Sequence, residues 1–87
     1  AWTLVQERVQ EIISKEISEF SRKWFVSEQE VGAEAMSWKA GDPVHLTGDY
    51  EEYKSSANPL SKLRYMSELR KAAEKFFKDT VVPFRKF

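Results

Sequence analysis

The chain has 87 residues, enough for one small domain, and its fourteen basic side chains balance fourteen acidic ones. Only three Gly and three Pro occur, which argues against an all-β fold or a disordered tail. The absence of Cys excludes disulfides and thiolate zinc sites, and we expect a reducing compartment, the cytoplasm. No apolar run approaches the roughly 18 residues of a membrane span, so we expect no membrane partner.

The first segment predicts a long amphipathic helix that ends near residues 24–26. At about 100° per residue its apolar side chains fall on one broad face. Glu16 also points along this face, and we expect it to reach an edge or to pair with a base of the last helix. The apolar face consists of Trp2, Val5, Val9, Ile12, Ile13, Ile17, Phe20 and Trp24.

A second helix is expected to start at Glu28. Ser27 and Glu30 have the spacing of a capping box, in which a Ser side chain and a Glu three residues later satisfy the first backbone N–H groups. Gly32 weakens this helix, and the Gly-Asp-Pro sequence at 41–43 ends it. Its short apolar stripe is formed by Val31, Ala35 and Trp38.

Residues 40–58 are predicted to form a long irregular connection. Residues 44–46 have the composition of a few extended residues, but no partner strand is evident. A turn is expected at Gly48-Asp49, followed by one helical turn over residues 49–54 with Asp49 as its cap. Residues 55–58 are expected to form a loop.

The third long helix is predicted to open at Asn58, a capping residue, with Pro59 in its first turn. Val82-Pro83 should end it, because the residue before Pro avoids the helical region. The chain therefore predicts an all-α fold, a small three-helix bundle that makes residues 1–87 one helical domain. The core face of the third helix is formed by Tyr65, Met66, Leu69, Ala73, Phe76 and Phe77.

Charge is distributed unevenly along the chain. Residues 1–54 hold eleven acids and six bases, a net charge of −5, whereas residues 55–87 hold eight bases and three acids, a net charge of +5. Such asymmetry fits either charge complementation between packed helices or a surface for polyanions. A candidate surface for duplex DNA is the stripe of the third helix that consists of Arg64, Lys71, Lys75 and Lys78.

That stripe also fits an ordinary solvated face, because Glu68 lies within it and Glu74 is placed to pair with Lys78. It has no interleaved aromatic residue, so contact with a duplex backbone is favoured over single-strand binding. Candidate partner-binding residues are the aromatics Phe25, Phe84 and Phe87, the last two of which should dock either on the core or on a neighbour.

Catalytic and metal sites are not expected in this segment. His45 lies near Asp42 and Asp49, but no second imidazole accompanies it, and a surface histidine is the simpler interpretation. An acid followed by Glu52-Tyr53-Lys54 has the order of restriction-type nuclease residues, which bind Mg²⁺ only when neighbouring β-strands aim them at one point. The surroundings here predict turns and helices. No Ser/His/Asp set or P-loop is present.

The segment from Lys23 to Arg85 resembles a known family. Lys23-Trp24-Phe25-Val26 begins it, Asp49-Tyr50-Glu51-Glu52-Tyr53-Lys54 follows, and then comes Asn58-Pro59-Leu60-Ser61-Lys62-Leu63-Arg64-Tyr65. It closes on Phe76-Phe77 and Val81-Val82-Pro83-Phe84-Arg85. This order is similar to the extreme C-terminal region of the R (restriction and motor) subunit of type I restriction-modification enzymes.

The resemblance implies a parent protein that is an ATP- and Mg²⁺-dependent DNA translocase and endonuclease. It implies that this tail docks the motor on the methyltransferase and specificity subunits, with contact to duplex DNA as a second role. None of the family's nuclease or ATPase motifs lies in this segment, so no cofactor is expected here. The start at Ala1, without an initiator Met, favours a fragment of a longer chain. The alternative is a free-standing helical interaction domain unrelated to restriction.

Overall fold

A computed structural model describes residues 2–54 and 58–85. Helix forms most of these ranges and no strand occurs in them, which confirms the predicted all-α class. A π-helix over Phe77–Val81 and a 3-10 turn over Val82–Phe84 follow the last α-helix. The α-helices are α1 (Trp2–Trp24), α2 (Glu28–Ser37), α3 (Tyr50–Tyr53) and α4 (Pro59–Phe76).

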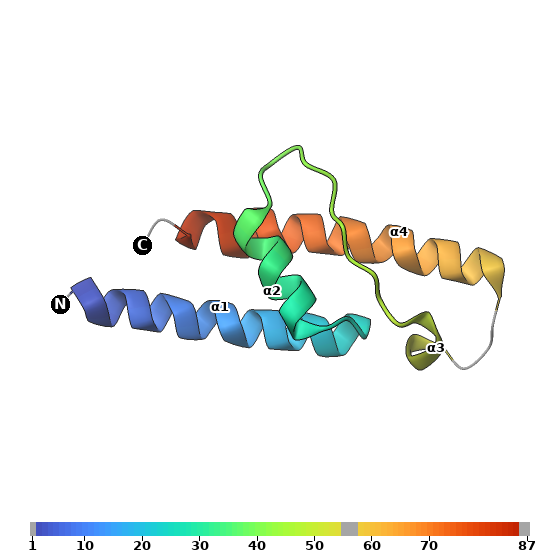
Figure 1. The fold of residues 1–87 in the computed structure, drawn as a ribbon, viewed down its shortest axis with the longest axis horizontal. Helices are drawn as coiled ribbons and strands as arrows, with labels where there is room; N and C mark the ends of the chain where they lie inside the picture. The colour runs from blue at the N-terminus through green and yellow to red at the C-terminus, as the bar shows by residue number, and fades with distance from the viewer. Residues whose placement is uncertain (1, 55–57, 86–87) are drawn as a thin grey trace.

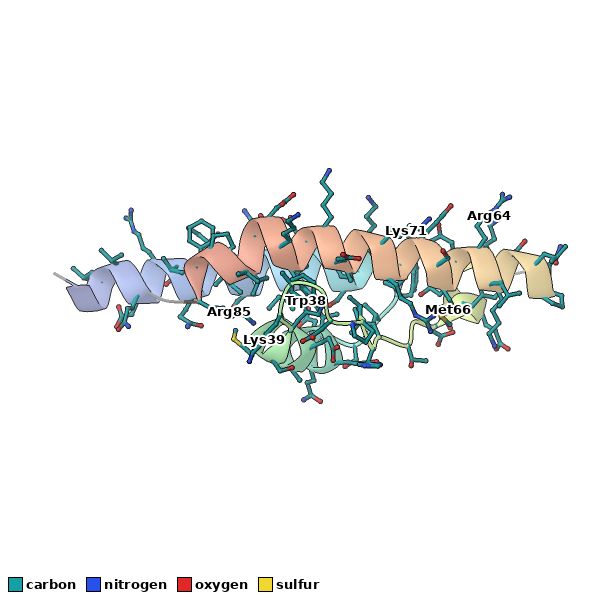
Figure 2. All side chains as sticks on the ribbon, turned by 90° about the horizontal axis from the view of Figure 1, so that it is seen from above. Trp38, Lys39, Arg64, Met66, Lys71 and Arg85 are labelled. Carbon is teal, nitrogen blue, oxygen red and sulfur yellow. The ribbon has the colours of Figure 1, made fainter. Side chains whose placement is uncertain are left out.

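The three longer helices form an elongated bundle, 52 Å along its longest axis. Helices α1 and α4 run side by side in opposite directions, and α2 lies across both (Figure 1). The view from above shows α2 and the chain that follows it on one side of the α1–α4 pair (Figure 2). The predicted three-helix bundle is therefore present, and α3 is a single turn within the 40–58 connection.

Side-chain caps start three of the helices at the predicted places. Ser27, Asp49 and Asn58 each accept a hydrogen bond from a backbone N–H two or three residues further along the chain, at 3.0–3.4 Å. Each bond satisfies one of the N–H groups that the first turn of a helix leaves without an internal partner. Pro59 occupies the first turn of α4, where its missing N–H costs nothing.

The core lies between the α1–α4 pair and the elements that cover one of its sides. Phe20 of α1 stacks on Phe76 of α4, with ring centroids 5.1 Å apart and an interplanar angle of 11°. Such large side chains bury much area per residue, which suits a domain of this size. The buried core residues are Ile13, Ile17, Val26, Val31, Ala35, Trp38, Val44, Leu46, Tyr50, Tyr65, Leu69, Ala73, Phe77 and Val81.

Residues 43–49 are extended, as predicted for 44–46, and carboxylates of α2 take the place of a partner strand. The backbone N–H groups of His45 and Thr47 donate to the side chains of Glu34 and Glu30, at 3.0 and 2.8 Å. The two carboxylates are four residues apart and so lie on one face of α2. Because side chains of an extended segment alternate, the residues on either side of His45, Val44 and Leu46, are buried.

The packed helices leave two residues of the apolar face of α1 exposed, Val5 and Ile12. Val5 is 47% exposed and Ile12 is 53% exposed. They are two turns apart on one flank of the apolar face, about 100° around the helix from the direction in which Ile13 is buried. Neither α1 nor any other helix in the described ranges is long and apolar enough to cross a membrane.

The end of the last helix also differs from the prediction. Val82 keeps helical angles, with φ −55° and ψ −45°, although Pro83 follows it. The α-helix instead gives way to a π turn at Phe77, five residues before Val82. The preference of a residue before Pro for extended angles is therefore overridden here. The physical reason is that Arg85, three residues after Val82, forms hydrogen bonds with the end of α2.

Arg85 joins the C-terminal end of the chain to the end of α2. Its Nη1 atom donates to the backbone oxygens of Ala35, Met36 and Trp38, at 3.0, 3.2 and 2.6 Å. Arg85 and Trp38 lie together at this end of α2 in Figure 2. The last carbonyls of a helix have no internal partner and carry partial negative charge, so a guanidinium satisfies them well.

Gly48 is required where the extended segment crosses α4. A Cβ atom at this position would overlap the hydroxyl of Tyr65 and would lie 3.0 Å from Cδ2 of Leu69. The segment can approach α4 this closely only without a side chain. Gly32, in the middle of α2, has no atom within 4 Å of the corresponding position.

We predict opposite effects for alanine at these two glycines. Gly48→Ala should lower the free energy of unfolding by about 2–3 kcal/mol, since overpacking displaces Tyr65. Gly32→Ala, the matched control, should raise it by about 0.5–1 kcal/mol, because Ala is the better helix former. Urea unfolding followed by circular dichroism measures both. Equal stability of the two variants would contradict the close approach at Gly48.

Candidate interaction surface

A groove with a volume of about 600 Å³ lies where the end of α1, the start of α2, the segment 47–51 and the start of α4 meet. Met66 contributes from α4, on the side of that helix opposite Arg64 (Figure 2). This volume falls within the range of ordinary ligand pockets. The apolar residues that line the groove are Phe25, Tyr50, Pro59 and Met66.

The backbone of Phe25, which lines the groove, is strained. Its φ is +55°, the left-handed conformation that usually falls to Gly at the end of a helix. The N–H of Val26 donates to the oxygen of Ser21 at 3.1 Å, which is the bond of a Schellman motif. The N–H of Asp49 donates to the oxygen of Phe25 at 2.7 Å. Two walls of the groove are thus joined by a backbone hydrogen bond.

The ring of Phe25 stands at the surface. It is 42% exposed, and it forms a T-shaped pair with the ring of Tyr53, with centroids 6.2 Å apart and an interplanar angle of 77°. A non-Gly residue in this conformation costs about 1–2 kcal/mol. Because the ring is exposed, its burial stabilises the fold too little to offset this strain. The position is therefore a candidate for function. The predicted partner-binding residue Phe25 therefore lies at the groove.

Acidic side chains dominate the rim of the groove. Glu30, Asp49 and Glu51 line it, against the single base Lys62. Glu30 is held by the N–H of Thr47, and Asp49 by its capping bond. Each of these carboxylates has a second oxygen that can accept a bond from a ligand. The groove therefore offers apolar surface next to fixed negative charge.

Tyr65 contacts several of the elements that line the groove. It is 2% exposed, and its hydroxyl donates to the backbone oxygen of Trp24 at the end of α1. Its ring lies against those of Tyr53 and Tyr50, with centroids 4.6 and 5.6 Å away. Burial raises the pKa of Tyr65 to about 12, and the charges of Asp49 and Tyr53 add to the effect.

The predicted basic stripe lies away from the groove. All four of its residues are exposed, and they lie on the face of α4 opposite Tyr65, Leu69 and Ala73. Arg64 points away from α2 and α3 in Figure 2. The stripe therefore does not face the core, and it is accessible to a ligand or to solvent.

The structure does not bring together the two predicted partner-binding aromatics that it describes, Phe25 and Phe84. Phe84, which is 38% exposed, belongs to the turn at the end of α4, whereas Phe25 ends α1 at the other end of the bundle (Figure 1). Phe87 lies outside the described residues. A docking surface near Phe25 therefore has to be built from the groove residues.

The acids and the histidine of the 40–54 region have structural roles or face solvent. Asp42 accepts a hydrogen bond from the N–H of Lys39 at 3.2 Å, Asp49 caps α3, and the His45 side chain is exposed. In the described part of the chain, no three His, Cys, Asp or Glu side chains gather in a group that could hold a metal ion.

Sequence reasoning missed the groove because its walls come from distant parts of the chain. Periodicity places Met66 on the core face, where it is half-buried, and Glu51 is predicted only as part of a helical turn. The one local signal is the Gly48-Asp49 turn, which marks where the chain bends past α4.

The chain shows no match to the models of known protein families, to the curated proteins or to the solved structures with which it was compared. The resemblance to the R subunit thus rests on the motifs in the sequence.

We predict that the buried hydroxyl of Tyr65 makes stability depend on alkaline pH. Its ordinary pKa is 10.0 and its folded pKa is about 12. Below pH 10 both states keep the proton, and above it the unfolded chain loses the proton first, so stability falls as pH rises from 10 to 12. The loss should approach about 2–3 kcal/mol.

Urea unfolding of the natural chain and of Tyr65→Phe between pH 8 and 12 measures this effect. The variant lacks the ionisable hydroxyl but shares every lysine, so the stability gap between the two proteins should narrow above pH 10. A constant gap over the whole range would show that Tyr65 does not titrate this way.

Proposed function

We propose that the chain is a non-catalytic assembly module, which docks the motor (R) subunit of a type I restriction-modification enzyme on its methyltransferase core. The order of motifs from Lys23 to Arg85 supports the family. The single structural observation that supports docking is Phe25, an exposed aromatic ring held in a strained backbone beside an apolar groove. Such a side chain is suited to bury itself against another protein.

In this proposal the partners are the methyltransferase and specificity subunits of the same complex, in the cytoplasm. The ATP- and Mg²⁺-dependent translocation and DNA cleavage belong to other parts of the parent enzyme. An open reading frame that continues upstream into helicase motifs favours the proposal. A start codon directly before Ala1 favours the alternative, a free-standing helical interaction domain unrelated to restriction.

Phe25→Gly separates docking from stability. Glycine adopts the left-handed conformation without strain, which offsets the loss of ring packing on Tyr53, so the free energy of unfolding should stay within about 1 kcal/mol. Docking of the native protein on the methyltransferase core, measured by surface plasmon resonance, should weaken at least tenfold, which corresponds to about 1.4 kcal/mol.

Met36→Ala is the matched control. Met36 is 51% exposed at the end of α2, outside the groove, and its loss should leave docking unchanged. Docking that is insensitive to Phe25→Gly, or equally sensitive to both changes, would count against a docking site at Phe25.

The exposed basic stripe supports a second candidate function, contact with duplex DNA. Arg64, Lys71, Lys75 and Lys78 extend over about 21 Å of helix, at 1.5 Å per residue. Each phosphate that a lysine neutralises releases condensed counterions, so binding should depend steeply on salt.

Reversing Lys71, Lys75 and Lys78 to Glu should weaken binding to a 20-base-pair duplex. The slope of log affinity against log salt should fall by up to about three units, one for each phosphate that is no longer neutralised. Fluorescence anisotropy between 50 and 200 mM salt measures both. Reversal of Arg8, Lys15 and Lys39, exposed bases outside the stripe, is the control for net charge. Equal losses in the two variants would remove the stripe as a DNA site.

A further inference from the structure

The groove beside Phe25 is held in shape by bonds that do not involve a ligand. The N–H of Asp49 fixes the segment 47–51 to the end of α1, and the hydroxyl of Tyr65 fixes α4 to the same end. The floor of the groove between them is formed by its apolar lining residues Phe25, Tyr50, Pro59 and Met66. The side chain of Met66 is flexible and adapts to the shape of what it contacts. A preformed groove loses less entropy on binding than a surface that must first be ordered.

The charge at the rim restricts what the groove can hold. Glu30, Asp49 and Glu51 stand there against one lysine, Lys62. Phosphate groups and carboxylates would be repelled, which disfavours nucleic acids, anionic lipids and acidic peptides. A cation would be attracted, and the exposed ring of Phe25 would add a favourable cation–π contribution.

We propose that this groove binds a segment of a partner protein in which an arginine or lysine stands next to a bulky apolar residue. The apolar side chain occupies the floor at Phe25 and Met66, and the cation lies among Glu30, Asp49 and Glu51. Complementary charge fixes the orientation of the segment, and the apolar contact supplies most of the affinity. The inference rests on the proposed docking function and names the chemistry that the docked partner presents.

Two capped dipeptides serve as probes, N-acetyl-leucyl-arginine amide and its acidic counterpart N-acetyl-leucyl-glutamate amide. Added to the isotope-labelled chain, the basic probe should shift the amide signals of Thr47, Gly48 and Asp49 in a saturable way. The acidic probe should bind at least fivefold more weakly. Raising the salt from 50 to 500 mM should reduce the difference, because exposed charges are screened.

Variants at Glu51 test the rim directly. Glu51 is exposed, so its replacement should leave the fold intact, and unchanged dispersion of the amide signals would verify this. Glu51→Lys should weaken binding of the basic probe at least fivefold, and the conservative Glu51→Gln should weaken it about twofold to threefold. Glu7→Lys makes the same charge change about 27 Å away along α1, at 1.5 Å per residue from Phe25, and should leave binding unchanged.

Failure of this inference differs from failure of the docking proposal. Equal binding of the two probes, or signal shifts that lie outside the groove, would overturn the inference. So would docking on the methyltransferase core that is lost in Phe25→Gly and unchanged in Glu51→Lys, although the docking proposal would survive. Selective binding of the basic probe by a chain that does not dock would overturn the docking proposal alone.

Discussion

The hydrogen bond from the Tyr65 hydroxyl to the carbonyl of Trp24 is the constraint on which this end of the bundle depends. One buried side chain of α4 satisfies a carbonyl at the end of α1, where no intrahelical donor exists. Its ring also contacts Tyr50 and Tyr53, and its hydroxyl lies against Gly48. Tyr65 therefore sets the relative positions of α1, α3, α4 and the extended segment. A buried phenol needs such a partner, because an unsatisfied hydroxyl would cost more than the bond contributes.

The groove is a consequence of that arrangement. Helix α1 ends at Trp24, and the left-handed backbone of Phe25 changes the direction of the chain there. The carbonyl of Phe25 accepts a hydrogen bond from the N–H of Asp49. The opposite end of the bundle is closed by Arg85 on the last carbonyls of α2. Both ends are thus held by polar side chains or backbone groups that satisfy helix termini. Between these ends, apolar packing supplies the stability, and the groove remains as the acidic concavity at the Tyr65 end.

Much of the fold was predictable because its signals are local. Capping residues such as Ser27 and Asn58 fix where helices start, and apolar periodicity identifies α1 and α4. Pairings between distant residues were not predictable in this way. The sequence carries no local sign that the carboxylate of Glu30 bonds the N–H of Thr47, or that one flank of α1 with Ile12 stays exposed. Of the candidate site, only Phe25 was identified, because the groove exists only once the helices are packed.

Hydrogen–deuterium exchange of the native protein that carries this chain, with and without the methyltransferase complex, tests the docking claim most directly. The groove is lined from residues 25–30, 47–51 and 58–66, and the three lysines of the basic stripe lie within residues 71–78. Docking at the groove predicts slower amide exchange over 25–30 and 47–51, with little change over 71–78. Unchanged exchange over 25–30 and 47–51, with protection over 71–78 alone, would contradict the account, since the contact would then lie on the basic stripe.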